Sequence, residues 1–191
     1  MRTAKIAWFG LAVLFISGCS GESEYDYAVP SEVCRVNIPA SEIKPLLRPG
    51  KVIKETFREI GLRSGEHHSC DLVVDKKQDV SISVSRQTGE LDIAEKAADK
   101  YVNLNRVSVS SGVTSAAVGD DGAVAWMKCK PKAGQPQYEF PEAKQGEYSH
   151  LALEVRTESE SDGVKNSGQR RAEIESFLRA YVPALMKDWC S

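Results

Sequence analysis

The chain has 191 residues, of which 41% are hydrophobic and 27% are charged, and its formal net charge at pH 7 is −2. This length suits one domain with a proper hydrophobic core. The mildly acidic balance argues against nucleic acid as a partner, because general binding to phosphates needs a basic surface.

The amino-terminal residues place a short apolar run behind a positively charged start. Arg2 and Lys5 precede the uncharged stretch 6–16. A helix that spans a bilayer needs about 20 apolar residues, so this run is too short for that role and fits the apolar part of a signal peptide. Small residues follow, and the stretch 16–19 (Ile-Ser-Gly-Cys) resembles the bacterial lipobox, whose cysteine receives a diacylglycerol before cleavage. We expect a lipoprotein-type signal peptide over residues 1–18.

Lipidation at Cys19 would attach the mature chain to the extracytoplasmic face of the cell membrane. Each buried methylene contributes about 0.8 kcal/mol and one myristoyl-length chain binds only marginally, so two acyl chains on one residue give a durable anchor. The alternative interpretation makes residues 6–16 a buried core helix and Cys19 an ordinary cysteine. We expect residues 19–33 to form the lipidated cysteine and a flexible tether, because residues 20–30 are polar and acidic and could reach about 35 Å.

The rest of the chain, residues 34–191, is expected to form a single globular extracytoplasmic domain. Removal of residues 1–18 takes away two basic residues and leaves 23 Lys and Arg against 27 Asp and Glu, a net charge near −4. The mature surface is therefore expected to be mildly acidic.

Four further cysteines, Cys34, Cys70, Cys129 and Cys190, lie in this domain. An even number in an exported chain suggests two disulfides. Of the three possible pairings we favour Cys34–Cys70 and Cys129–Cys190, because consecutive pairing lets each half of the domain close its own loop. In the chain-entropy model each loop would stabilise the fold by roughly 4 kcal/mol. The alternative is a zinc site with nearby histidines, but no Cys-x-x-Cys pair is present, so we expect no metal.

The first half of the domain is predicted to hold a short helix and a hairpin. The helix begins near Pro39 with Ser41 as a plausible N-cap, and Pro49-Gly50 ends it. Two strands follow, over residues 70–75 and 80–85, and the second alternates Val, Ile and Val with serines. The polar connection between them predicts a hairpin.

The second half is predicted to repeat helix, strands and helix. An amphipathic helix is expected over residues 91–104, because its alanines and Tyr101 follow the spacing of one helix face. The other expected elements are strands over residues 113–118, 123–130 and 151–155, a polar loop over residues 157–168, and a terminal helix whose apolar stripe runs from Ile174 to Trp189.

Strands joined by short turns favour antiparallel pairing. We therefore predict an α+β fold, an antiparallel sheet with helices packed on one face and two disulfides.

The residues that carry chemistry do not assemble into a recognisable catalytic pattern in the sequence. His67, His68 and His150 are expected to be exposed loop histidines, and adjacent residues of an extended segment point to opposite sides, so the first two could not easily share a metal. Ser110 and Ser111 lie in a Ser-Gly loop without a Gly-x-Ser-x-Gly motif. No phosphate-binding or dinucleotide-binding glycine motif is present. The sequence therefore predicts a protein that is not an enzyme, without catalytic residues or cofactors.

Four aromatic residues lie near one another between prolines: Trp126, Tyr138, Phe140 and Tyr148. An aromatic, proline-rich segment between strands is a possible binding surface. The alternative is a long loop that packs on the core.

A wider pattern of residues accompanies these motifs: Cys34 with Ile38-Pro39, then residues 70–74 (Cys-Asp-Leu-Val-Val), residues 123–129 (Ala-Val-Ala-Trp-Met-Lys-Cys) and residues 177–181 (Phe-Leu-Arg-Ala-Tyr) before Cys190. With the lipobox, this layout resembles small secreted actinobacterial lipoproteins (Streptomyces-type) of unknown function. The resemblance covers most of the mature chain and implies location and architecture, and it transfers no catalytic residue.

The sequence thus favours a membrane-anchored, non-enzymatic binding or accessory module at the cell envelope. Its expected partners are the membrane, through the lipid on Cys19, and an envelope protein or a small ligand. Two alternatives stay open: a cell-envelope hydrolase whose acidic residues meet only in the fold, and an extracytoplasmic sensor or regulator partner.

Overall fold

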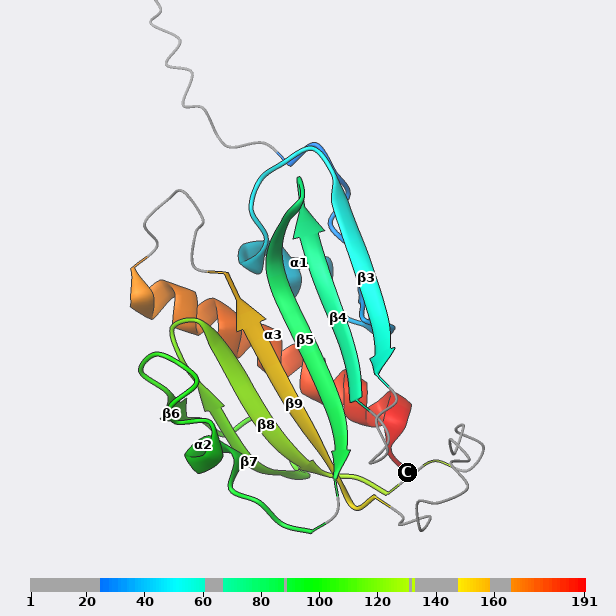
Figure 1. The fold of residues 1–191 in the computed structure, drawn as a ribbon, viewed down its shortest axis with the longest axis vertical. Helices are drawn as coiled ribbons and strands as arrows, with labels where there is room; N and C mark the ends of the chain where they lie inside the picture. Colours follow the sequence, from blue (N-terminus) through cyan, green and yellow to red (C-terminus); the bar gives the residue numbers. More distant parts are fainter. Residues whose placement is uncertain (1–24, 61–66, 88, 131, 133–147, 159–165) are drawn as a thin grey trace, which may run out of the picture.

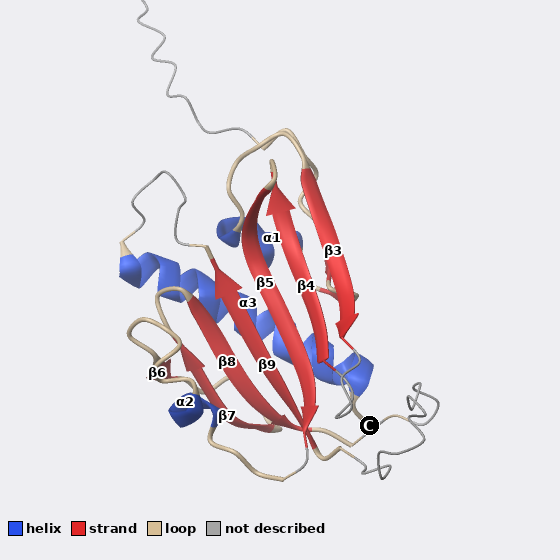
Figure 2. Ribbon diagram, viewed as in Figure 1, coloured by secondary structure: helices blue, strands red, loops and turns tan. Residues whose placement is uncertain are grey.

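The computed structural model describes residues 25–60, 67–87, 89–130, 132, 148–158 and 166–191. These residues form one large antiparallel sheet, a small two-stranded hairpin and a few helices (Figures 1 and 2). The strands are β1 (Glu32–Val33), β2 (Val36–Asn37), β3 (Ile53–Ile60), β4 (His67–Val74), β5 (Lys77–Gln87), β6 (Asn105–Arg106), β7 (Val113–Val118), β8 (Gly122–Lys128) and β9 (His150–Thr157). The helices are α1 (Ala40–Ile43), the 3-10 helix η1 (Lys44–Leu46), α2 (Ile93–Lys96) and α3 (Ser167–Trp189).

The large sheet has the strand order β3-β4-β5-β9-β8-β7-β6, and every neighbouring pair is antiparallel. Strands β3, β4 and β5 make up its first half, and strands β6, β7 and β8 make up its second half. Strand β9 lies between β5 and β8, so it joins the two halves into one continuous sheet (Figure 1). The predicted antiparallel sheet is confirmed.

The hairpin of β4 and β5 confirms the predicted pair of strands and extends both. Val80, Ile82 and Val84 are buried, and the serines between them point to the other face and are half-buried. The connection is a two-residue turn, Asp75-Lys76, in which both residues have positive φ (48° and 71°). Such turns match the twist of a hairpin.

Strand β3 was not predicted from the sequence. It lies at the edge of the sheet and pairs with β4 alone. Its outward positions carry Lys54, Thr56 and Arg58, and Glu55 is also exposed on the other face. An edge strand with polar residues on both faces has no clear period-2 alternation of apolar and polar residues. Strand β3 could therefore not be recognised from the sequence pattern.

The two faces of the sheet are covered by different helices. Helix α3, α1 and η1 bury the main core on one face, with help from the β1–β2 hairpin. Helix α2 contacts β7 and β8 and belongs to a second apolar cluster. Along β8, Ala123 and Ala125 belong to the main core, whereas Val124 and Trp126 belong to the second cluster. Because neighbouring residues of a strand point to opposite faces, the expectation that helices pack on one face is not confirmed.

Helix α2 is much shorter than the helix predicted over residues 91–104. The Asp92 carboxylate caps it by accepting hydrogen bonds from the backbone N–H groups of Ala94 and Glu95. The chain then turns, because Val102 donates its N–H to the Asp121 carboxylate and accepts from the N–H of Asp120 in the β7–β8 turn. These bonds bring Tyr101 into the second cluster, where burial raises the pKa of its hydroxyl to about 12.

Helix α3 confirms the predicted terminal helix. The Asn166 side chain caps it by accepting from the N–H of Gln169 at 2.7 Å. The apolar stripe that includes Ile174 is buried as predicted, and Pro183 lies on an exposed position within the helix. None of the helices among the described residues is long and apolar enough to cross a membrane.

The first short helix differs in detail from its prediction. Helix α1 begins after Pro39, and no side chain caps it, so Ser41 is not its N-cap. The helix continues as η1, with Pro45 in its first turn, and ends at Leu46 rather than at Pro49-Gly50. A proline at this position leaves the helix without one backbone donor, which a single 3-10 turn does not need.

Both disulfides pair as predicted. The Cys34–Cys70 bond joins the β1–β2 turn to β4 over a sequence separation of 36, and the Cys129–Cys190 bond joins the residues that follow β8 and α3 over a separation of 61. Each disulfide therefore fixes the main-core layer to a different half of the sheet.

The domain includes residues before the predicted boundary at residue 34. Tyr25 forms a bridge with Gly50, its hydroxyl donates to the carbonyl of Leu47, and the Tyr27 hydroxyl donates to the carbonyl of Arg48. Burial raises the pKa of both tyrosine hydroxyls. Residues 25–33 are therefore part of the domain and not of the tether, which corrects the predicted boundary.

Candidate functional site

The expected aromatic binding surface is not assembled by the described residues. Trp126 is 2% exposed and lies in the second cluster, where its ring stacks on His150 with centroids 5.4 Å apart. Because β8 is covered on this face by α2, the indole is a core residue and cannot contact a partner. Tyr148 is half-buried, and Tyr138 and Phe140 lie outside the described residues. Cys19, the predicted lipidation site, also lies outside them.

Tyr148 belongs to a row of stacked cationic and aromatic side chains near the carboxyl end of α3. The ring centroids of Phe57 and His68 are 5.8 Å apart, and those of His68 and Trp189 are 4.8 Å apart. The Arg86 guanidinium lies 5.4 Å from the Trp189 centroid and 4.9 Å from that of Tyr148. The cavity beneath Phe57 and Trp189 measures about 10 Å³, which leaves no space for a ligand. This row fixes α3 to the sheet.

The histidines lie in strands, and the expectation of exposed loop histidines is wrong. His67 and His68 are half-buried in β4, and His150 is buried in β9. As predicted for an extended segment, His67 and His68 alternate between faces. Cys34, Glu55 and Cys70 are the one group of possible metal ligands close together among the described residues. Both sulfurs are in a disulfide, so they are not available as thiolates.

One serine and one histidine are in hydrogen-bond contact. The Ser149 hydroxyl lies 2.8 Å from Nδ1 of His150, and it also accepts from the N–H of Gly89 at 3.3 Å. A nucleophile and base need an acidic group on the other side of the imidazole to orient it. Among the described residues Nε2 of His150 has no hydrogen-bond partner. The pair therefore lacks the third member of a catalytic triad.

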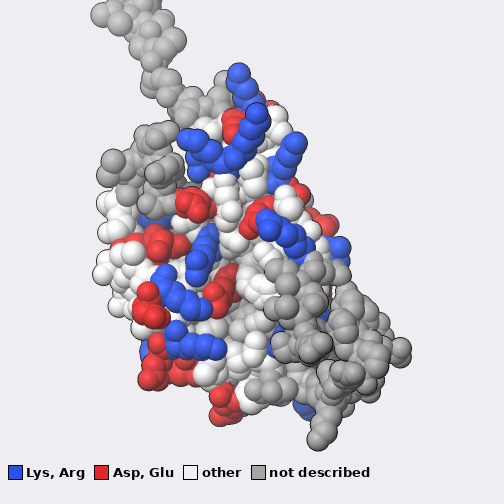
Figure 3. All heavy atoms as spheres, viewed as in Figure 1, with Lys and Arg blue, Asp and Glu red and all other residues white. Residues whose placement is uncertain are grey.

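A polar surface covers the first half of the sheet and β9 on the side away from α3. We call it the open face, and it comprises the residues Thr56, Arg58, His67, Ser69, Asp71, Ser81, Ser83, Ser85, Glu154 and Arg156. No member of the second cluster comes from β3, β4 or β5, so the apolar layer under α2 stops at β9. Figure 3 views the molecule from this side, with acidic and basic side chains interspersed over the sheet.

The open face is organised in rows that run across the strands. One row pairs Arg58 with Ser69, Ser69 with Ser83, and Ser83 with Glu154. Each serine presents a hydroxyl that can donate and accept. The serine hydroxyls of β5 and β4 thus form a polar strip between charged side chains.

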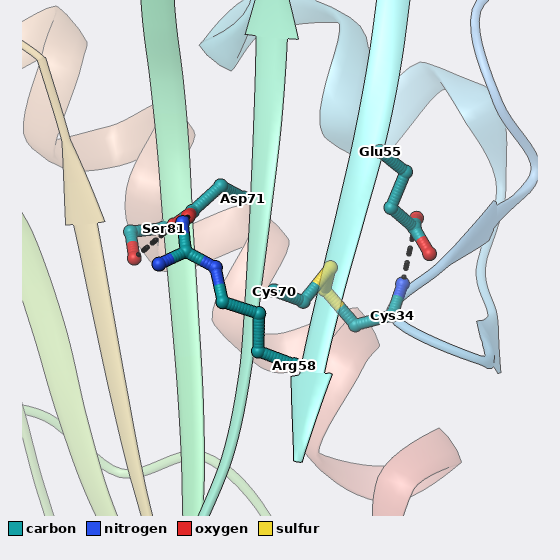
Figure 4. The surroundings of a disulfide bond; sticks show 6 residues. All are labelled: Cys34, Glu55, Arg58, Cys70, Asp71 and Ser81. Carbon is teal, nitrogen blue, oxygen red and sulfur yellow. Dashed lines mark hydrogen bonds and ion pairs between the residues drawn. A yellow bond between two sulfur atoms is a disulfide. The ribbon is translucent and has the colours of Figure 1, made fainter. Parts of the chain in front are cut away.

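An ion pair between β3 and β4 lies beside this strip. The Asp71 carboxylate accepts a hydrogen bond from the Arg58 guanidinium at 2.6 Å and one from the Ser81 hydroxyl at 2.7 Å. Figure 4 shows these three side chains on one side of the sheet, while Cys70, the neighbour of Asp71, points to the other side and bonds with Cys34. Asp71 is buried and the Arg58 side chain is 60% exposed, so the guanidinium can reach a bound group.

A second hollow lies beside β7, at the other side of the molecule. It measures about 360 Å³ and its walls come from residues 107–110, residues 113–116 and Arg179 of α3. The Arg179 guanidinium is held by the Glu175 carboxylate at 2.6 Å. A hollow of this size with hydroxyls and one cation could take a small polar molecule.

The open face offers hydroxyls and charged groups that can form hydrogen bonds with a bound molecule. Hydroxyls and paired charges lie on one face of the sheet, and neither a reactive thiolate nor an oriented Ser-His-acid set is found in the part of the chain described above. Ser81, Ser83 and Ser85 were visible in the sequence as the outward side of a strand. Serines at three successive outward positions are the signal in the sequence that could have indicated this surface.

Comparisons with protein-family models, with curated proteins and with solved structures find no match for this chain.

Proposed function

We propose that the chain is an exported lipoprotein, anchored by acyl chains on Cys19 to the extracytoplasmic face of the cell membrane, whose domain is a non-enzymatic binding module of the small actinobacterial lipoprotein type. The observation that carries the proposal is the order of features at the amino terminus: basic residues, the apolar run 6–16, small residues and Cys19. The two disulfides support it, since such bonds persist in oxidising compartments.

The open face is the proposed binding surface of this module. Its serine hydroxyls are held on a rigid sheet and are only half-buried, so they can form hydrogen bonds without an ordering cost in the backbone. The Arg58 guanidinium and the Glu154 carboxylate at the two ends of one row add charged groups of opposite sign. A polar envelope molecule or protein surface with hydroxyl and charged groups fits this chemistry.

Site-specific photocrosslinking in the native cell tests the location of this surface. A photoreactive residue at Ser83 should give a discrete crosslinked species, whereas the same residue at Ala172, exposed on α3, should give none. Crosslinks at Thr114, in the wall of the hollow beside β7, with none at Ser83 would contradict the assignment. Equal crosslinks at Ser83 and Ala172 would also contradict it.

A Cys19→Ala variant tests the anchor. We expect it to leave the membrane fraction or to keep its signal peptide, because the thiol that receives the lipid is gone. Unchanged fractionation together with an unchanged mass would defeat the proposal.

A further inference from the structure

Four exposed lysines gather at the end of the domain where the chain enters it: Lys51, Lys54, Lys76 and Lys77. The chain enters at Tyr25, which forms its bridge with Gly50, the residue before Lys51. In the strand register Val73 lies opposite Lys54, and Val74 lies opposite Lys77. Figure 3 shows basic side chains gathered at this end of the molecule, beyond the tips of β3, β4 and β5 in Figure 1. We call these four residues the lysine end.

The lysine end is not neutralised within the domain. None of the four lysines has an ion-pair partner among the described residues. The nearby Asp75 carboxylate accepts from the backbone N–H groups of Lys51 and Val52, each at 3.0 Å. Asp26 is the other exposed acidic residue beside Gly50, to whose carbonyl it donates its N–H. Among the described residues, this end of the domain thus holds four exposed lysines and the exposed carboxylates of Asp26 and Asp75.

An exposed apolar side chain lies within the lysine end. Val52 is 51% exposed, although it is a β-branched apolar residue next to the sheet. Flanking lysines and a projecting apolar side chain are the combination found where proteins touch a membrane surface: the cations meet anionic headgroups and the apolar group enters the interface.

The length of the tether places this end of the domain next to the bilayer. With Cys19 in the membrane, residues 20–24 are the whole connection to Tyr25, and at full extension this connection spans about 20 Å. From this geometry, and resting on the proposed lipid anchor, we propose that the lysine end docks on anionic phospholipid headgroups and holds the domain in one orientation. In this orientation the β4–β5 turn lies next to the membrane surface. The open face is then directed parallel to the membrane and stays accessible to partners in the envelope.

The overall charge of the chain requires that an electrostatic contact with an anionic surface come from a local group of lysines. The mature chain is acidic as a whole, with a net charge near −4, and the tether itself carries Glu22 and Glu24. Attraction to an anionic surface must therefore come from a local cluster. A lysine held near such a surface strengthens binding about 5-fold, and the effect fades within a Debye length, about 10 Å at 0.1 M salt.

Vesicle co-sedimentation of the mature chain, residues 19–191 with Cys19→Ser, tests the contact without the lipid. We expect binding to phosphatidylglycerol–phosphatidylcholine vesicles that falls in 0.5 M salt, and weak binding to pure phosphatidylcholine. The quadruple variant Lys51→Gln, Lys54→Gln, Lys76→Gln and Lys77→Gln should lower the partition coefficient by up to about 600-fold, because the factors of about 5 for the four lysines multiply. Val52→Ser should lower it further by a few-fold.

A matched variant with the same change of net charge serves as control: Lys96→Gln, Lys128→Gln, Lys130→Gln and Lys187→Gln, all exposed and away from the lysine end. It should bind anionic vesicles like the parent chain. Equal loss in both quadruple variants, or binding that does not depend on the anionic lipid, would overturn the proposal.

Lysine labelling of the native, membrane-bound protein tests the same contact in place. A membrane-impermeant amine reagent should modify Lys51, Lys54, Lys76 and Lys77 slowly until detergent is added, and should modify Lys128 and Lys187 equally in both conditions. Equal labelling of both groups before detergent would contradict the orientation. The two proposals fail separately, because an unacylated amino terminus is detected by mass and leaves the vesicle result unaffected.

Discussion

The two halves of the sheet share one backbone architecture but differ in what covers them. Over the first half, one face lies under the main core and the other is the open face. Over β7 and β8, α3 packs on one face and α2 on the other. One row of the sheet displays the contrast: Ser83 on β5 and Val124 on β8 both lie opposite Glu154 of β9, on the same face. Ser83 is half-buried, and Val124 is fully buried.

This difference explains the sequences of the strands. Strand β5 alternates apolar residues with serines because no described helix packs on one of its faces, whereas β8 reads Gly-Ala-Val-Ala-Trp-Met without a break because both of its faces are packed. Packing thus dictates the residues of β8, while the outward residues of β5 are free to serve another purpose. For this reason we place the binding surface on the first half.

The largest effects are expected from the disulfides, and they test whether the halves fold together. Replacing Cys129 and Cys190 by serine should lower the free energy of unfolding by about 4 kcal/mol, because the loop of separation 61 is released in the unfolded state. The corresponding change at Cys34 and Cys70 should cost slightly less, since its loop is shorter. Chemical denaturation should give one transition in each variant, since β9 joins the halves. Two separate transitions would show that the halves are independent.

The next largest loss of stability is expected from a substitution in β8, which is packed on both faces. Val124→Ser should destabilise the domain by about 3 kcal/mol, because it removes buried apolar surface and places a hydroxyl in the second cluster. Urea denaturation of the variant and the parent measures this loss. A loss of stability below 1 kcal/mol would mean that α2 does not bury this face of the sheet.

A smaller effect is the pH dependence of stability that comes from Asp92, the residue that caps α2. The hydrogen bond from Arg106, with those from the N–H of Glu95 and the Ser115 hydroxyl, lowers the pKa of the Asp92 carboxyl to about 2. The stabilisation is fully present above the unfolded pKa near 4 and is lost as the pH falls through about 2. Acid melting curves between pH 4 and 2 should therefore fall less steeply for Asp92→Asn than for the parent. Melting temperatures that fall equally steeply with pH in the variant and the parent would contradict the lowered pKa of Asp92.

The smallest effect is expected on the open face. Ser83→Val should change the free energy of unfolding by less than about 0.5 kcal/mol, because no described helix packs over this position and valine suits a strand. Ser83 and Val124 lie in the same row and on the same face of the sheet. Comparing the stability losses of Ser83→Val and Val124→Ser therefore tests the difference between the two halves most directly. If the same urea experiment showed a large loss for Ser83→Val, the open face would have to be part of a packed interface.

Several elements with a clear hydrophobic periodicity were predictable from the sequence. The elements that pack against them were not. The alternation in β5, the cysteine pairing and the stripe of α3 all follow from local pattern or from loop closure, and the structure confirms them. The edge strand β3 was missed because its exposed residues break the alternation.

The candidate site was less predictable because exposure depends on distant parts of the chain. Trp126 resembles a surface aromatic when it is read beside a proline-rich segment, but α2, some thirty residues earlier, covers it. The same limit applies to His68 and His150, whose burial follows from strand pairing and from Trp189 and Trp126. The open face could be predicted only as the outward side of one strand.

The measurement that tests the central claim most directly is the intact mass of the amino-terminal peptide of the protein purified from its native membrane. The account predicts a peptide that begins at Cys19 and carries the mass of a diacylglyceryl group, which alkaline hydrolysis reduces by the ester-linked acyl chains. A peptide that begins at Met1, or one that begins at residue 19 with a free thiol, would contradict it.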